Sequence, residues 1–87
     1  MKWTLHYSKR AEKDAYLVKR AKLEKQAARV LAILEKNPFQ NPPPYEKLTG
    51  ELRGFYSRRI NIKHRIIYDV LEEERIVLIL RMWSHYE

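Results

Sequence analysis

The chain has no cysteine, only two glycines and no long apolar run. Without cysteine, neither a disulfide framework nor a thiolate metal site can form. No apolar segment approaches the roughly 18 residues that a membrane-spanning helix needs. The N-terminal residues also lack the apolar core of a secretory signal. We therefore expect a soluble, cytoplasmic protein with no membrane contact.

Acidic residues are scarce where basic residues gather. The 87 residues carry 18 Lys and Arg against 11 Asp and Glu, a formal net charge of +7. Between Lys47 and Arg65, six basic residues accompany a single acid, Glu51. Arginines clustered on strands are typical of surfaces that bind phosphate or carboxylate, so we expect an anionic partner. The basic residues of the N-terminal third are instead expected to form mainly a solvated helix face.

The chain length and an apolar fraction of 45% suit one domain, residues 1–87, with one modest core. Alternation predicts an edge strand over residues 2–7, and Ser8 is a suitable N-cap for the following helix. Apolar stripes at helical spacing then cover residues 11–18 and 23–34. We expect an αα-hairpin that bends near residues 20–22, with one long helix as the alternative.

A proline-rich connector follows the helices. Asn37-Pro38 ends the second helix, and residues 37–45 hold all four prolines. Because prolines cost little entropy to hold rigid, this connector should deliver Glu46 to a fixed place beside the sheet.

Three strands are predicted, over residues 55–60, 64–71 and 75–83, and Glu72-Glu73-Glu74 is expected to be a solvated turn. The fold class is therefore α+β, a small, twisted, antiparallel-rich sheet with two N-terminal helices on one face. Strict alternation assigns Arg65 and His85 to the open face. It assigns these apolar residues to the helix-covered face: Ile66, Tyr68, Val70, Leu78, Leu80 and Met82. It assigns the following to the open face: Lys63, Arg65, Ile67, Asp69, Val77, Ile79, Arg81, Trp83 and His85.

Several of these side chains suit metal-free RNA cleavage, in which a 2′-hydroxyl attacks its own phosphate. That reaction needs a base, positive charge on the phosphorane and an acid for the 5′-oxygen. Glu46, remote from other acids, is the candidate base, although an ordinary surface glutamate is the alternative. Arg65, with Arg58 or Arg59, can bind the phosphate.

His85 is the best candidate acid, because histidine titrates near neutrality. For Arg65, a salt bridge to Asp69 or Glu46 is the alternative to phosphate binding. Trp83 and Tyr86 can stack on bases. For Tyr56 we favour a place in the core.

His6 and His64 lie at no metal-ligand spacing with His85. We expect no metal and no cofactor.

The chain resembles the RelE/YoeB group of toxin–antitoxin ribonucleases, the Txe/YoeB branch in particular. The resemblance covers nearly the whole chain in order, and its most specific residues lie in the C-terminal half. These are Glu46, Leu48, Leu52, Gly54, Phe55, Ser57-Arg58-Arg59-Ile60, His64-Arg65, Tyr68 and His85-Tyr86.

The resemblance implies a small toxin that enters the ribosomal A site, cuts mRNA during translation and is held inactive by a cognate antitoxin. It further implies that Glu46 is the general base, Arg65 stabilises the transition state and His85 is the general acid. Tyr86 would orient a base or the phosphate. The expected RNA-binding residues are Lys47, Arg58, Arg59, Arg81 and Trp83. The oligomeric state is left open, with a homodimer among the alternatives.

The chain departs from this family pattern at two positions. Thr49 stands where relatives often carry lysine, so a phosphate contact there is lost or passes to Lys47. Trp83 stands where relatives commonly have a basic residue, and Arg81 is the candidate substitute.

Two other functions are considered: a ParE-like toxin that acts by binding a protein such as gyrase, and a basic module that binds RNA or the ribosome. The joint presence of a base and an acid favours the nuclease.

Overall fold

The computed structural model describes residues 2–85, and within them lie two α-helices, a short 3₁₀ helix and five strands. In chain order the elements are β1 (Thr4–Tyr7), α1 (Lys9–Arg20), α2 (Glu24–Lys36), β2 (Glu46–Lys47), η1 (Gly50–Leu52), β3 (Tyr56–Arg59), β4 (His64–Leu71) and β5 (Ile76–His85). The predicted α+β class is confirmed. The three C-terminal strands form close to their predicted bounds, whereas β2 and η1 were not predicted.

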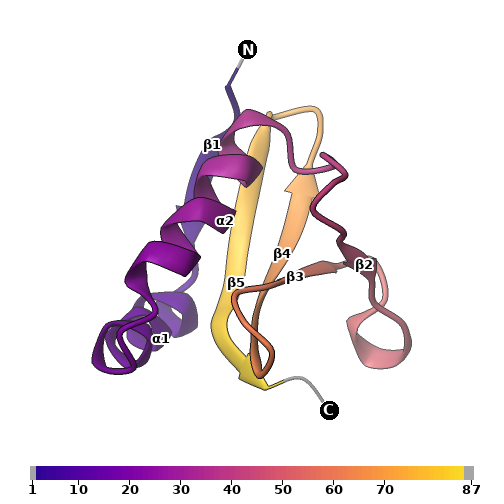
Figure 1. Ribbon diagram of the computed structural model, residues 1–87. Helices are drawn as coiled ribbons and strands as arrows, with labels where there is room; N and C mark the ends of the chain where they lie inside the picture. The colour runs from indigo at the N-terminus through magenta and orange to yellow at the C-terminus, as the bar shows by residue number, and fades with distance from the viewer. Residues whose placement is uncertain (1, 86–87) are drawn as a thin grey trace.

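The sheet has the order β1-β5-β4-β3-β2, with β1 parallel to β5 and every other neighbouring pair antiparallel. In Figure 1, β4 and β5 run along the length of the molecule while β3 and β2 cross toward one side, so the sheet is strongly twisted. As predicted, β1 is an edge strand. The sheet therefore divides into a β1–β5–β4 part and a β3–β2 part.

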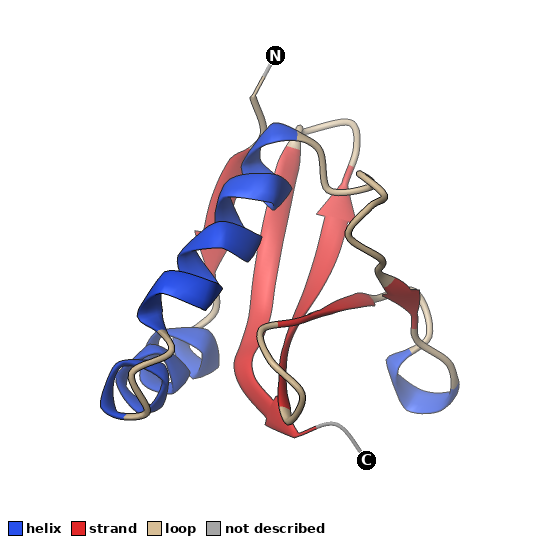
Figure 2. Ribbon diagram, viewed as in Figure 1, coloured by secondary structure: helices blue, strands red, loops and turns tan. Residues whose placement is uncertain are grey.

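The two helices form the predicted αα-hairpin. Ser8 caps α1, since its side chain accepts a hydrogen bond from the amide of Ala11. The turn between the helices contains Lys22 with a positive φ of 60°. Both helices lie over the β1–β5 part of the sheet, and β2 and β3 extend beyond them (Figure 2). None of the helices in the described chain is both long and apolar enough to cross a membrane.

The core forms between the helices and the sheet. Its buried residues are Trp3, Ala11, Val18, Ala27, Val30, Leu34, Ile60, Ile66, Tyr68, Val77, Ile79 and Met82. The face assignment was wrong for four residues of β5: Val77 and Ile79 are fully buried, whereas Leu78 and Leu80 are only half-buried. Met82 is buried in the core, as predicted.

Two register shifts explain this error. Tyr68 and Ile67 of β4 lie opposite Ile79 and Arg81, so Leu80 is an extra residue in β5. Arg65 lies opposite Ser84, which inserts a second extra residue after Arg81. Each bulge reverses the alternation of side chains, and strict period-two counting along β5 therefore fails.

Candidate active site

Strand pairing brings Glu46 and two arginines to one face of the sheet. Glu46 lies opposite Ser57, and Arg59 lies opposite Arg65. Residues opposite one another on adjacent strands point to the same face, as do residues two apart on one strand. Glu46, Arg59 and Arg65 therefore share a face. The catalytic and RNA-binding roles expected of these three residues stay predictions.

Glu46 and Arg59 also line one pocket. The pocket has a volume of about 270 Å³. Its lining residues are Val30, Pro43, Pro44, Glu46, Ser57, Arg58 and Arg59. Glu46 and Arg59 are exposed, Arg65 is half-buried, and Ser57 is buried beneath them. A carboxylate and a guanidinium thus border a concave surface next to the proline-rich connector.

Arg58 does not fit the RNA contact predicted for it. The side chain is only 2% exposed. Its guanidinium donates hydrogen bonds to the carbonyls of Pro38, Gln40 and Pro43 in the connector. Arg58 faces the opposite side of β3 from Arg59, toward Tyr68, and the connector covers it. Its donors therefore stabilise the fold.

Arg81 is likewise engaged within the protein. Its Nε donates to Oδ2 of Asp14 at 2.8 Å, an ion pair between β5 and α1. The guanidinium that we expected to contact RNA is therefore paired with a carboxylate, although about a third of the side chain is exposed. Lys47 is exposed on β2 and lies opposite Tyr56, so alternation assigns it to the other face from Glu46.

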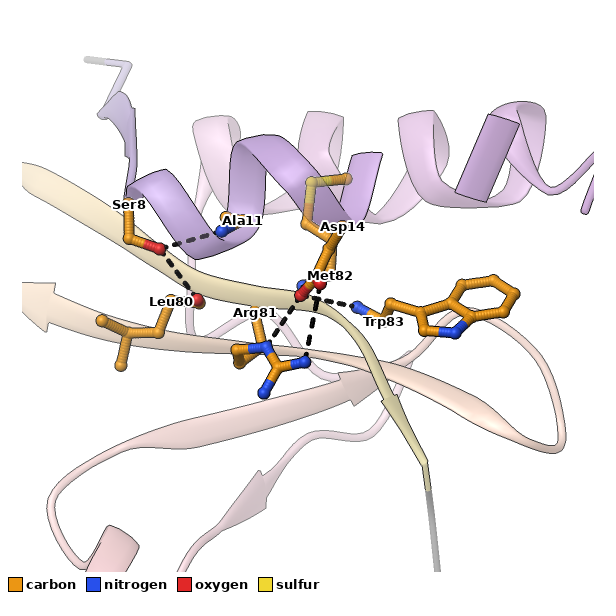
Figure 3. Close-up of polar contacts among 7 residues, drawn as sticks. All are labelled: Ser8, Ala11, Asp14, Leu80, Arg81, Met82 and Trp83. Atoms are coloured by element: carbon orange, nitrogen blue, oxygen red, sulfur yellow. Dashed lines mark hydrogen bonds and ion pairs between the residues drawn. The ribbon is translucent and has the colours of Figure 1, made fainter. Parts of the chain in front are cut away.

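Asp14 was missed by the sequence analysis, and it organises the second bulge of β5. Figure 3 shows its carboxylate reaching from α1 to the strand. Asp14 Oδ2 accepts hydrogen bonds from the amides of Met82, at 3.0 Å, and Trp83, at 3.3 Å. These amides belong to the segment where β5 leaves regular pairing with β4, and buried amides need acceptors.

The other bulge is also supported by α1. The extra residue Leu80 has a carbonyl that accepts a hydrogen bond from the Ser8 hydroxyl at 2.8 Å (Figure 3). Asp14 lies three residues after Ala11 and four before Val18, on the buried stripe of α1. An acid at such a position is the sequence signal that identifies it.

The environment of Asp14 favours its charged form. Burial alone would raise the pKa of Asp14, but hydrogen bonds from Arg81 and from the amides of Met82 and Trp83, with the positive charge of Arg81, outweigh it. The pKa of Asp14 therefore lies below its ordinary value of 3.8.

The end of β5 packs against the start of β4. The Trp83 indole stacks on the His64 ring, with centroids 3.8 Å apart and planes inclined by 18°. His64 is buried, and its Cα lies opposite that of His85. The indole that we expected to stack on a base thus contacts a protein ring.

The roles predicted for Arg65, His85 and Tyr86 stay predictions. The backbone of His85 ends β5 opposite His64, whereas Arg65 lies opposite Ser84, so the register does not reproduce the strict alternation that assigned Arg65 and His85 to one face. The side chain of His85 lies outside the described part of the structure. Tyr86 falls outside the described residues. Within residues 2–85 no group of three or more acidic or histidine side chains is arranged to hold a metal ion.

Comparison with known proteins agrees with the resemblance seen in the sequence. The sequence profile of the family described as "YoeB-like toxin of bacterial type II toxin-antitoxin system" matches residues 5–86. The chain is 34% identical over 65 residues to "Toxin RelK" of Mycobacterium tuberculosis, which covers 75% of this chain and 74% of that protein. It is 32% identical over 65 residues to "Toxin YoeB" of Streptomyces coelicolor, with 75% of each chain covered.

Solved structures share the fold. The toxin in the YoeB–YefM complex of Staphylococcus aureus superposes with a TM-score of 0.78 at 28% identity, covering 99% of this chain and 100% of that chain. The YoeB/ParE toxin of Agrobacterium tumefaciens reaches a TM-score of 0.83 at 24% identity, covering 95% and 99% of the two chains, a likeness of fold alone. With the family profile spanning nearly its whole length, the chain belongs to the YoeB-like toxins of bacterial type II toxin–antitoxin systems.

Proposed function

We propose that this toxin is an endoribonuclease that cleaves mRNA during translation, in the ribosomal A site. The observation that carries the proposal is the shared face of Glu46, Arg59 and Arg65, with Glu46 and Arg59 on the rim of one pocket. A carboxylate beside two guanidinium groups supplies a base and positive charge at a single phosphodiester. Family membership supports the same reaction class.

In the proposed mechanism, the Glu46 carboxylate accepts the proton of the RNA 2′-hydroxyl. The 2′-oxygen then bonds to the adjacent phosphorus, Arg65 stabilises the negative charge of the phosphorane, and Arg59 binds the RNA backbone. His85 donates a proton to the departing 5′-oxygen as its bond to phosphorus breaks, and Tyr86 orients the nucleotide. The products are a cyclic phosphate and a 5′-hydroxyl. The side chains supply base, charge and acid, so the proposed reaction uses no metal.

The proposed partners follow from charge and from the relatives. The S. aureus YoeB is solved in complex with YefM. For this chain, with a net charge of +7, we propose a cognate antitoxin whose acidic segment covers the face of Glu46 and Arg65. The toxin would act in the cytoplasm, where mRNA is translated. The S. aureus YoeB is also solved as a dimer, and sedimentation of this chain alone would distinguish a dimer from a monomer.

The proposal is tested by adding the purified chain to a cell-free translation reaction and mapping message ends by primer extension. We expect cuts within codons that leave cyclic or 3′-phosphate ends. Glu46→Gln, Arg65→Ala and His85→Ala should each lower the cleavage rate by about 100-fold or more. Glu51→Gln, the same change at an exposed acid outside the pocket, is the matched control. An intact message with arrested translation would instead indicate a toxin that acts by binding.

A further inference from the structure

The guanidinium of Arg58 is an anchor for the proline-rich connector. Nη1 donates to the carbonyl of Pro43 at 2.8 Å. Nη2 donates to the carbonyls of Gln40, at 2.6 Å, and Pro38, at 3.0 Å. One buried side chain on β3 therefore binds the connector at three points along residues 38–43.

Two tyrosines complete the surroundings of Arg58. Its Nε donates to the Tyr68 hydroxyl at 3.2 Å, and that hydroxyl donates to the carbonyl of Pro38 at 3.1 Å. The guanidinium carbon lies 5.0 Å from the centre of the Tyr45 ring. Hydrogen bonds and a cation–π contact thus hold the charge where water is excluded.

Arg58 also lies between the two segments that carry Glu46 and Arg59 into the pocket lining. Its contact with Tyr45 is one residue before Glu46 in the chain. Its own neighbours on β3 are Ser57, which lies opposite Glu46, and Arg59, which lines the same pocket. Movement of the Arg58 guanidinium would therefore displace Glu46 relative to Arg59 on the pocket lining.

We propose that Arg58 is a positioning residue for Glu46: it fixes the path of the connector and thereby the place of the carboxylate on the pocket rim. The inference rests on the proposed function. The connector has no regular secondary structure between α2 and β2, so its path depends on such contacts. Packing of Phe39 and Tyr45 on Tyr56, with ring centroids 5.5 and 5.9 Å apart, adds to them.

Lysine cannot replace this guanidinium. The planar guanidinium of Arg58 donates hydrogen bonds in several directions, to the carbonyls of residues 38, 40 and 43. An ammonium group donates from a single nitrogen and lacks a flat face to lie over Tyr45. Arg58→Lys therefore keeps the charge while it releases part of the connector, which makes it the informative variant.

The first test measures the position of Glu46 without reference to RNA. Amide hydrogen exchange should become at least about 10-fold faster over residues 45–48 in Arg58→Lys, while α1 and α2 stay protected. Tyr68→Phe removes only one of the anchoring groups and should give a smaller change in the same direction. Arg20→Lys, the same replacement on the exposed end of α1, is the control. Unchanged exchange over residues 45–48 in Arg58→Lys would overturn the proposal, whatever the nuclease assay gives.

The second test is a double-mutant cycle on message cleavage. Arg58→Lys should lower the rate at saturating message about 10- to 100-fold, because a small displacement of a catalytic group has effects of this size. In the Glu46→Gln background, Arg58→Lys should change the rate less than about 3-fold, since the group that it positions is gone. Equal losses in both backgrounds would overturn positioning through Glu46. Full activity of Glu46→Gln would reject the proposed base, and the exchange test would still decide whether Arg58 sets the connector.

If Arg58→Lys does not fold, Tyr68→Phe replaces it in both tests. A loss of cleavage in Tyr68→Phe that disappears in the Glu46→Gln background supports the proposal. A loss that persists there contradicts it.

Discussion

The Oδ2 atom of Asp14 on α1 accepts a hydrogen bond from the guanidinium of Arg81 on β5. The same atom accepts hydrogen bonds from the backbone amides of Met82 and Trp83. One side chain of the first helix thus satisfies the backbone at the place where the last strand leaves regular pairing. The segment that it holds leads directly to His85. A helix that has no residue on the pocket rim therefore fixes the course of the strand that ends at the proposed acid.

Replacement of Asp14 by alanine should lower the free energy of unfolding by about 2–3 kcal/mol, because the buried amide of Met82, the partly buried amide of Trp83 and the Arg81 guanidinium lose their acceptor. Asp14→Asn keeps an acceptor oxygen and should lower it less. Urea denaturation of the three proteins measures the difference. Glu12→Ala, an exposed acid of the same helix, should stay within about 1 kcal/mol of wild type. Equal effects of Asp14→Ala and Glu12→Ala would contradict this role.

The same carboxylate should make stability depend on acid. The folded state lowers the pKa of Asp14, so its charged form favours folding. The contribution is fully present above the unfolded pKa, about 4, and is lost as the pH falls through the lower folded value. The stability difference between wild type and Asp14→Asn should therefore be constant from about pH 5 to 7 and shrink below about pH 4. A difference that grows on acidification would refute this sign.

Local patterns were sufficient to predict much of the fold. Ser8 caps α1 and the apolar spacing of residues 23–34 forms α2, since helix signals depend on residues near one another in the chain. The two bulges of β5 were beyond such reasoning. They depend on a hydrogen bond that Ser8 donates to Leu80 and on one that Asp14 accepts from Met82, and both helix residues are distant from β5 in the sequence. Tertiary contacts therefore set the alternation that sequence counting assumed.

The arrangement of the candidate site could be predicted only in part from the sequence. Glu46, Arg59 and Arg65 share a face of the sheet, and the roles that the resemblance implies for them stay predictions. Arg58 was expected beside them, because adjacent arginines on a strand look alike in a sequence. The structure separates the two by alternation: both line the pocket, but Arg59 is exposed, whereas Arg58 is buried under the connector. No pattern within β3 indicated that carbonyls of residues 38–43 would cover one of them.

Tyr68 should resist ionisation in alkaline solution. Burial raises its pKa to about 12, although the charge and hydrogen bond of Arg58 oppose this shift. Because the folded pKa lies above the ordinary value near 10, the neutral phenol favours folding. That contribution is complete below about pH 10 and is lost as the pH rises through about 12.

We expect a component near pH 12 in the ultraviolet absorbance of tyrosinate, and this component should vanish in Tyr68→Phe. Tyr16→Phe is the matched control, because Tyr16 is 75% exposed. If the late component disappeared in Tyr16→Phe instead, it would belong to Tyr16, and the prediction for Tyr68 would be wrong. The free energy of unfolding of Tyr68→Phe should also fall less than that of wild type between about pH 10 and 12.

Arg59 should contribute to RNA affinity through charge, in contrast to its buried neighbour. It is exposed on the rim of the pocket with Glu46. Arg59→Ala should lower cleavage at subsaturating message about 10-fold, the loss of one charge-assisted contact. It should also reduce the salt dependence of RNA binding by about 0.7 in the slope of log affinity against log salt, as expected for one phosphate contact to a single strand. Arg59→Lys should retain most of that slope.

Arg53→Ala, which removes an exposed arginine outside the pocket lining, controls for net charge. Identical salt slopes and rates for the two alanine variants would mean that Arg59 acts only through the general field of the protein.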